Sequence, residues 1–158
     1  MKYYHITPTR NKLSIMSSGL KSNDKHEIFV FTDPIQSIFI ATNQLGIAQF
    51  TMFEISSKGI TGTIESDNVA DFGSVNQLII KQGLIEAKYI EHLHDIDANM
   101  LDMINTTEEL KLKKMGYNKA EIIDTMRLYP ERTNRYNIVH GTNYTVLSID
   151  EFNRKYSA

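Results

Sequence analysis

Short apolar runs that end in hydrogen-bonding residues dominate the beginning of the chain. Residues 3–7 predict a short strand, because Pro8 favours an extended conformation in the residue before it. Residues 27–32 are almost continuously apolar, which is typical of a strand that is buried on both faces. Between these runs, Thr9 is placed to cap a helix and Gly19 is placed to end it. The opening therefore predicts a strand, a helix and a second strand.

Two helices are predicted in this first part of the chain. In the first helix, Leu13 and Met16 lie three residues apart with Ile15 alongside, so these residues are its expected apolar side. The second helix follows the strand at 27–32. Asp33 is suited to cap it, and Pro34 suits its first helical position because proline there loses no hydrogen bond.

The middle of the chain alternates between apolar runs and turn residues. Residues 49–56, 77–81 and 92–96 predict strands, and residues 83–90 predict a turn with one helical turn. Residues 65–76 are polar and weakly patterned, so we expect a loop there. Strands that cluster in the middle, with helices towards the ends, favour an α+β fold over regular βαβ winding.

From about residue 99 the pattern changes to more polar segments. The predicted elements of this part are a helix over 106–116, a helix over 119–128, a charged loop over 131–135, a strand over 144–149 and a final helix capped by Asp150. Asn118 and Glu121 have the spacing of a capping box, which supports the second of these helices, although Ile122 and Ile123 equally suit a strand. We expect a single domain, with residues 1–98 forming the core and residues 99–158 packed on it as a tail.

Composition excludes some classes of function. The chain has 158 residues, 41% of them hydrophobic, and a formal net charge of -2, so no overall positive charge favours nucleic acid or anionic membrane. It has no cysteine, which removes disulfides and thiolate chemistry. No apolar run is long enough to span a bilayer. We therefore expect a cytoplasmic protein of a bacterium, or of the host cell if a phage encodes it.

The order of several short motifs resembles the ADP-ribosyltransferase superfamily, in particular its short bacterial and phage members. The segments that carry the resemblance are Tyr4-His5-Ile6-Thr7, Ser18-Gly19-Leu20-Lys21, Ile28-Phe29-Val30-Phe31-Thr32-Asp33, Phe50-Thr51-Met52-Phe53-Glu54-Ile55 and Gly83-Leu84-Ile85. Each segment is short, and their order along the chain makes the likeness. The resemblance implies a pair of small, mostly antiparallel sheets around a cleft that holds NAD, with flanking helices and no metal.

The resemblance also implies roles for single residues. His5 would bind the ribose on the nicotinamide side, and Thr7 would support it. Phe29 or Phe31 would pack against the nicotinamide ring. Thr32 would line the pocket, and Arg10 would meet the pyrophosphate, although a cation at an exposed helix start is also ordinary surface.

The glutamate that usually completes this site is missing from the aligned positions. Alignment on Gly83-Leu84-Ile85 places Gln77 there, and an amide accepts hydrogen bonds without acting as a base. Glu54 and Glu65 are the acidic residues that stand in for it if the register differs. Gln77 and Glu54 are therefore the candidate catalytic residues, and the departure favours a protein that has lost catalysis.

Two further groups of residues suggest other chemistry. His92 and His94 lie two apart on a predicted strand, where both imidazoles would share one face and bind a metal, although two ligands alone are a weak signal. Arginines alternate with tyrosines near the end, a composition that suits nucleic acid, an acidic partner or a plain charged surface. The residues of this group are Arg127, Tyr129, Arg132, Arg135 and Tyr136.

Three functions follow from the sequence. The first is a catalytically degenerate ADP-ribosyltransferase-like protein that keeps an NAD-type pocket and binds a protein or nucleic-acid target. The second is an active NAD-dependent mono-ADP-ribosyltransferase with a non-standard catalytic residue. The third is an RNA 2′-phosphotransferase-like enzyme, which shares the fold and works without the glutamate. The sequence does not identify the partner or the oligomeric state.

Overall fold

The protein contains two compact units, which are called the sheet unit and the helical unit here. The computed structural model describes residues 1–67 and 77–157. The sheet unit is Met1–Asp97, and the helical unit is Ala98–Ala158. Within the described residues no helix combines the length and the apolar character needed to cross a bilayer.

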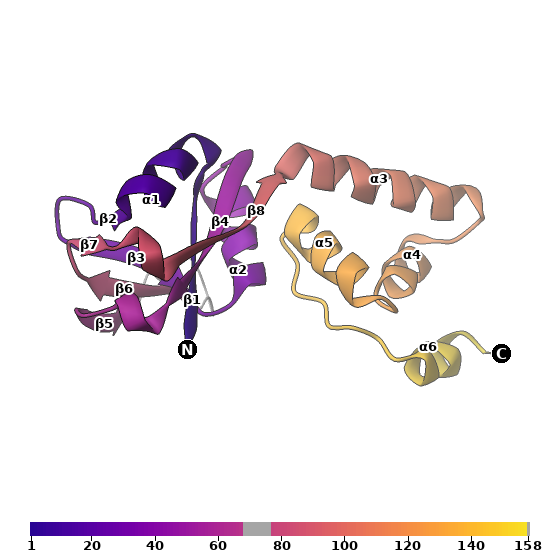
Figure 1. Ribbon diagram of the computed structural model, residues 1–158. Helices are drawn as coiled ribbons and strands as arrows, with labels where there is room; N and C mark the ends of the chain where they lie inside the picture. The colour runs from indigo at the N-terminus through magenta and orange to yellow at the C-terminus, as the bar shows by residue number, and fades with distance from the viewer. Residues whose placement is uncertain (68–76, 158) are drawn as a thin grey trace. The chain divides into compact units, whose positions relative to one another are not determined.

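The sheet unit is built on a six-stranded sheet with the order β5-β6-β3-β1-β4-β8 (Figure 1). Every neighbouring pair in it is antiparallel. Its strands are β1 (Lys2–Pro8), β3 (Glu27–Phe31), β4 (Gln49–Ser56), β5 (Thr63–Ser66), β6 (Gln77–Lys81) and β8 (Ile90–Asp97). A second sheet pairs β2 (Leu20–Lys21) with β7 (Leu84–Ile85). The predicted α+β class is confirmed. The loop expected at 65–76 is wrong at its start, where β5 continues to Ser66, and residues 68–76 of it lie outside the described residues.

One face of the six-stranded sheet, the α1 face, carries the largest apolar cluster. Tyr3 of β1, Val30 of β3 and Phe53 of β4 are buried there. Ile15 of α1 (Lys12–Ser18) and Leu20 of β2 cover them. The α1 helix ends as predicted at Gly19, whose φ of 85° and close approach to the carbonyl oxygen of Ile85 both require glycine.

Two details of α1 differ from expectation. Ile15 is the buried residue of the helix, whereas Leu13 and Met16 are exposed. Thr9 does not cap α1, because a short 3-10 turn, η1 (Thr9–Asn11), comes first. The side chain of Asn11 donates to the Thr7 hydroxyl at 2.8 Å instead of capping α1.

The opposite face of the sheet, the α2 face, is covered by the helix α2 (Pro34–Phe39), which contacts β1 and β3. Ile6, Phe31 and Met52 are buried, and the strand register turns them to this face. The start of α2 is as predicted, because the Ile35 amide donates to the Asp33 carboxylate at 2.8 Å. A π-helical turn, η2 (Ile40–Gln44), follows.

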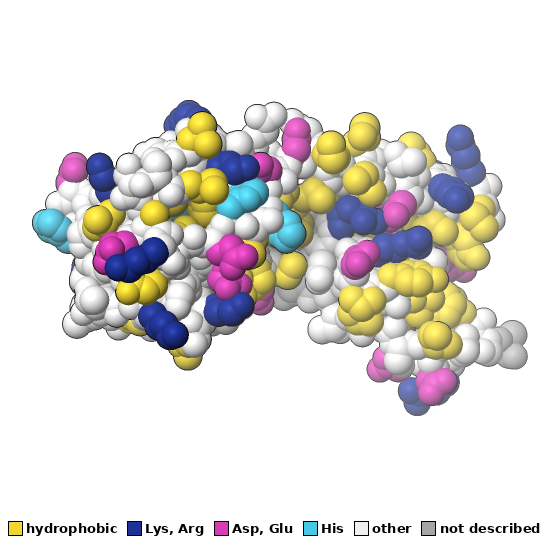
Figure 2. Space-filling model, viewed as in Figure 1, with side chains coloured by type: hydrophobic (Ala, Val, Ile, Leu, Met, Phe, Trp, Pro, Cys, Tyr) yellow, Lys and Arg dark blue, Asp and Glu magenta, His cyan; other side chains and the backbone are white. Residues whose placement is uncertain are grey.

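The helical unit contains four helices within its described residues. They are α3 (Ala98–Lys114), α4 (Lys119–Met126), α5 (Pro130–His140) and α6 (Ile149–Tyr156). Ile122 and Met126 of α4 pack with Tyr136 of α5 to form a small core. The capping box of Asn118 and Glu121 is present at α4, as the spacing predicted. Apolar side chains also remain exposed in the helical unit (Figure 2). Met100 and Met103 of α3 are among the exposed residues.

Four predictions for the helical unit are wrong. The α3 helix begins at Ala98 and not near Thr106, because the Thr107 hydroxyl bonds back to the Met103 carbonyl inside the helix instead of capping it. The segment 131–135 is helix rather than loop, because Pro130 takes the first helical position, where its missing N–H loses no hydrogen bond. Residues 144–148 form no strand. The α6 helix is capped by Ser148 and not by Asp150.

The segment before α6 is held by individual hydrogen bonds instead of a strand ladder. The Asn137 side chain donates to the Tyr144 carbonyl at 2.8 Å, and the Arg127 guanidinium donates to the Thr145 carbonyl at 2.8 Å. The Leu147 amide donates to the Arg127 carbonyl at 2.7 Å. These bonds satisfy backbone groups that a neighbouring strand would otherwise satisfy.

Candidate functional site

A groove of about 340 Å³ lies between β1, α1, β2 and β3 in the sheet unit. We call it the His5 groove. Its polar lining comes from strand ends and from the turn before β3, where the chain leaves the apolar cluster of the α1 face. The polar residues that line it are His5, Thr7, Asn11, Ser14, Lys21, Asn23 and Glu27.

His5 is held in one orientation at the floor of this groove. Its Nδ1 lies 2.8 Å from the Phe29 carbonyl oxygen. Because a carbonyl oxygen only accepts hydrogen bonds, Nδ1 carries the proton of the neutral ring and Nε2 is left as an acceptor. Burial lowers the pKa of His5, and the bond to Phe29 opposes this only in part. A neutral imidazole with a free acceptor nitrogen is suited to receive a ligand hydroxyl.

Thr7 lies two residues after His5 on the same side of β1. Its side chain is buried, and its hydroxyl oxygen accepts from Asn11 at 2.8 Å. The hydroxyl proton of Thr7 can therefore be donated to another acceptor, such as a ligand. His5 and Thr7 thus bring one acceptor and one donor to the same groove.

Of the other residues predicted for this pocket, Phe31, Glu54 and Gln77 lie elsewhere. Strand register pairs Tyr4 with both Phe31 and Glu54, and pairs Phe31 with Gln77. Since paired residues share a face and neighbours along a strand alternate, these side chains point to the α2 face, opposite His5.

Contacts around Glu54 and Gln77 agree with that placement. Glu54 forms an ion pair of 2.8 Å with Lys2, which alternation also places on the α2 face. The Gln77 side-chain oxygen is buried without a hydrogen-bond partner in the described structure. Thr32 and Arg10 are exposed and do not line the groove. Phe29 lines it and is turned by alternation to the α2 face, while its carbonyl holds His5.

One carboxylate residue does line the His5 groove, and sequence reasoning missed it. In the sequence, Glu27 is the first residue of the predicted strand over 27–32. Its carboxylate accepts from Lys81 at 2.6 Å and from Asn23 at 3.3 Å, and these hydrogen bonds lower its pKa. The Asn23 carbonyl-type side-chain oxygen also accepts from the Glu27 amide at 3.0 Å, so this turn is rigidly tied to β3. The spacing of asparagine and glutamate around the turn was the available signal.

A second polar cluster lies on the α1 face, centred on Asp95 of β8. Lys12 lies 2.8 Å from one of its oxygens, and the buried Thr51 hydroxyl donates to the other at 2.7 Å. His92 also approaches Asp95, at 3.0 Å. Hydrogen bonds from Lys12 and then Thr51 hold the pKa of Asp95 well below its usual range. The cluster joins α1 to the edge of the sheet.

The predicted pairing of His92 with His94 on one face is wrong. The register of β8 against β4 shifts between these residues, so that His92 pairs with Phe53 and His94 pairs with Met52. This bulge turns the two imidazoles to opposite faces. Within the described residues no group of three or more His, Asp or Glu side chains is arranged to hold a metal.

The arginines near the end of the chain are engaged inside the helical unit. Arg127 pairs with Asp124 at 3.1 Å, and Arg132 and Arg135 both pair with Glu108. Tyr136 is buried. Each arginine thus has a carboxylate partner, which reduces the charge that a phosphate backbone would meet.

Comparisons of the chain with descriptions of protein families, with curated proteins and with solved structures found no match in any of the three.

Proposed function

We propose that the sheet unit is an ADP-ribosyltransferase-like domain that holds an NAD-type nucleotide in the His5 groove and acts by binding a partner macromolecule. The observation that carries the proposal is the fixed imidazole of His5. Its Nδ1–H is used by the Phe29 carbonyl, so that Nε2 is available to accept from a ribose hydroxyl. Thr7 adds a hydroxyl beside it.

The positions of the candidate catalytic residues favour a binding role over group transfer. Loss of nicotinamide builds positive charge on the ribose, and a nearby carboxylate stabilises that charge. Glu54 and Gln77, which the resemblance offered for this task, are on the α2 face. A ligand in the His5 groove would not reach them through the sheet.

Glu27 supports a second candidate function, an active mono-ADP-ribosyltransferase. It lines the same groove as His5. The bonds that lower its pKa keep its carboxylate ionised at neutral pH. In this alternative Glu27, and not Glu54 or Gln77, would hold the ribose and stabilise the developing cation.

A thermal-shift titration with NAD tests the binding proposal. NAD should raise the melting temperature of the wild-type chain, and Ser14→Phe should remove the shift, because Ser14 is an exposed residue of α1 that lines the groove. Ser17→Phe is the matched control, since Ser17 is exposed on the same helix and does not line the groove. Absence of any NAD-dependent shift in the wild type would contradict the proposal.

Release of free nicotinamide separates the two candidates. The binding proposal expects no release above that of NAD alone, with or without cell lysate. Release that Glu27→Gln abolishes, while the thermal shift with NAD persists, would favour the active transferase. A Glu54→Gln variant serves as the control and should behave as the wild type in both measurements.

A further inference from the structure

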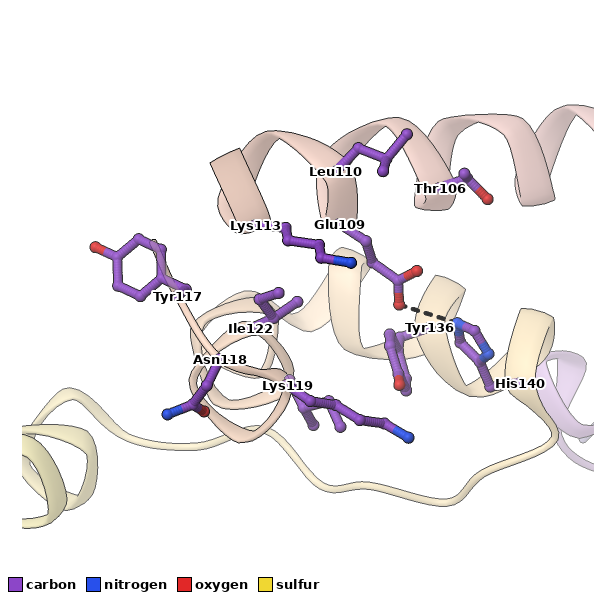
Figure 3. A pocket seen from close by; sticks show the side chains of 11 residues that line it. Thr106, Glu109, Leu110, Lys113, Tyr117, Asn118, Lys119, Ile122, Tyr136 and His140 are labelled. Carbon is purple, nitrogen blue, oxygen red and sulfur yellow. Dashed lines mark hydrogen bonds and ion pairs between the residues drawn. The ribbon is translucent and has the colours of Figure 1, made fainter. Parts of the chain in front are cut away.

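The helical unit has a pocket of its own, of about 480 Å³, between α3, α4 and α5 (Figure 3). Much of its wall is apolar. Leu110 lines it from α3, Ile122 and Ile123 line it from α4, and the ring of Tyr136 lines it from α5. Its volume falls in the range of roughly 300–1,000 Å³ that is typical of small-molecule sites. An apolar body can therefore lie against this wall.

The acidic group of this pocket already has a partner. Glu109 lies 3.1 Å from Nε2 of His140, the contact drawn as a dashed line in Figure 3. The His140 ring also packs against Tyr136, with ring centroids 4.2 Å apart. Because a carboxylate only accepts, Nε2 carries a proton and donates it to Glu109, so the Asn105 amide nitrogen, 3.1 Å away, adds no second hydrogen bond to Nε2. Glu109 is thus occupied by a neighbouring side chain.

The basic groups of the pocket are different. Lys113 enters from α3 and Lys119 from the start of α4, so that the two side chains line the pocket from two different helices (Figure 3). Within the described part of the chain, no carboxylate forms an ion pair with either lysine. With Glu109 held by His140, the charge that the pocket offers to a ligand is positive.

We propose that this pocket binds a small molecule with an apolar body and a single carboxylate group. The body would lie against Leu110, Ile122 and Ile123, and the carboxylate would meet Lys113 and Lys119. Charge complementarity selects the anionic head over a neutral or cationic one, because a cationic head would meet two like charges. The proposal is independent of the His5 groove, from which it differs in unit, lining and ligand chemistry.

Three probes with the same tail test the proposal on the full chain: octanoate, octanol and octylammonium. Calorimetric titration should show octanoate binding about tenfold or more tightly than octylammonium, with octanol between them. The backbone amide signals that shift with octanoate in NMR spectra should be those of the lining residues. Equal affinity for the three probes, or shifts that centre outside the pocket, would overturn the proposal.

Substitutions separate the head from the body of the site. In the double variant Lys113→Gln, Lys119→Gln the affinity for octanoate should fall to that for octanol. Lys114→Gln is the matched control, because Lys114 is exposed on α3 and does not line the pocket. An octanoate preference that survives in the double variant would contradict the assignment of the two lysines.

A pocket-filling variant tests where the tail binds. Thr106 lines the pocket and is exposed, so Thr106→Phe should fill it without disturbing a buried contact. Affinity for octanoate and for octanol should both be lost in this variant, while the circular dichroism spectrum stays that of the wild type. Unchanged octanol binding in a folded Thr106→Phe chain would place the tail elsewhere and overturn the proposal.

Discussion

The two units of the protein are stabilised by different interactions. In the sheet unit, apolar side chains of α1, β2, β7 and the central strands form one cluster on the α1 face, with Val30 and Phe53 fully buried at its centre. In the helical unit the apolar core is smaller, and Asp124 is buried beside it. The sheet unit therefore depends mainly on the hydrophobic effect, whereas the helical unit also depends on satisfying a buried charge.

Asp124 is the residue that joins α6 to the rest of the helical unit. Lys155 and the Tyr156 hydroxyl each lie 2.6 Å from one carboxylate oxygen, and Arg127 lies 3.1 Å from the other. Burial alone raises the pKa of Asp124, but Lys155, Tyr156 and Arg127 outweigh it, so that the pKa is lowered. The hydrogen bond that Tyr156 donates to Asp124 raises the pKa of Tyr156 to about 12. α6 therefore depends on an ionised Asp124.

The largest effect is expected from truncation of the sheet core. Phe53→Ala removes a fully buried ring and should lower the free energy of unfolding of the sheet unit by about 3–5 kcal/mol. Urea unfolding followed by amide signals of β1 and β4 measures this change. The control is Ile64→Ala on β5, where the side chain is exposed and a much smaller loss is expected. Equal losses in the two variants would contradict the account of the core.

A smaller effect is expected from neutralising Asp124. Asp124→Asn removes the charge from a site with three donors and should destabilise the helical unit by about 2–3 kcal/mol, with α6 separating first. Urea unfolding followed by amide signals of α6 and α4 checks this. Asp102→Asn, at an exposed position of α3, is the control and should be nearly neutral. Unchanged α6 signals in the Asp124 variant would show that α6 does not depend on this carboxylate.

Lowering the pH should weaken the attachment of α6 within the helical unit. Because the folded-state pKa of Asp124 is below its unfolded value, its contribution to stability is present above the unfolded pKa and is lost as the pH falls through the folded pKa. The α6 signals of the wild type should therefore weaken between about pH 5 and pH 2, and those of Asp124→Asn should change less over that range. If acid weakened the α6 signals equally in the wild type and in Asp124→Asn, the lowered pKa of Asp124 would be contradicted.

The smallest effect concerns the Asp95 cluster. Thr51→Val keeps the shape of a buried side chain and removes its hydrogen bond to the half-exposed Asp95 carboxylate. Water can replace the lost donor at Asp95, so the expected cost to the sheet unit is about 1 kcal/mol. Thermal unfolding of the variant measures it. A loss as large as that of Phe53→Ala would show that the cluster is central to the fold.

The sequence was more informative about the sheet unit than about the helical unit. The strand at 49–56 and the strand at 77–81 were predicted with the observed bounds, because clustered apolar residues between turn residues are a strong signal. In the helical unit, polar residues occupy much of each helix, and single hydrogen bonds decide the boundaries. Thr107 suits a helix cap as well as a helix interior, and Pro130 suits a helix break as well as a first helical position, so the local sequence does not distinguish them.

The candidate site was predictable only in part, for a related reason. His5 and Thr7 reach the same groove because they lie two apart on one strand, which sequence alone reveals. The sides taken by Phe31, Glu54 and Gln77 depend on how separate strands align, and one residue of register decides which face a side chain takes. The same limit applied to His92 and His94, where a bulge in β8 changed the register between them.

In the proposed function, the α1 face of the sheet, and not the α2 face, holds the nucleotide. An NMR titration of the full chain with NAD tests it most directly, because each face has its own amide signals. The predicted result is that the signals of Thr7, Ser14 and Leu20 shift together with increasing NAD, while those of Phe31 and Glu54 stay in place. Shifts centred on Phe31 and Glu54, or no shift at any residue, would contradict the account.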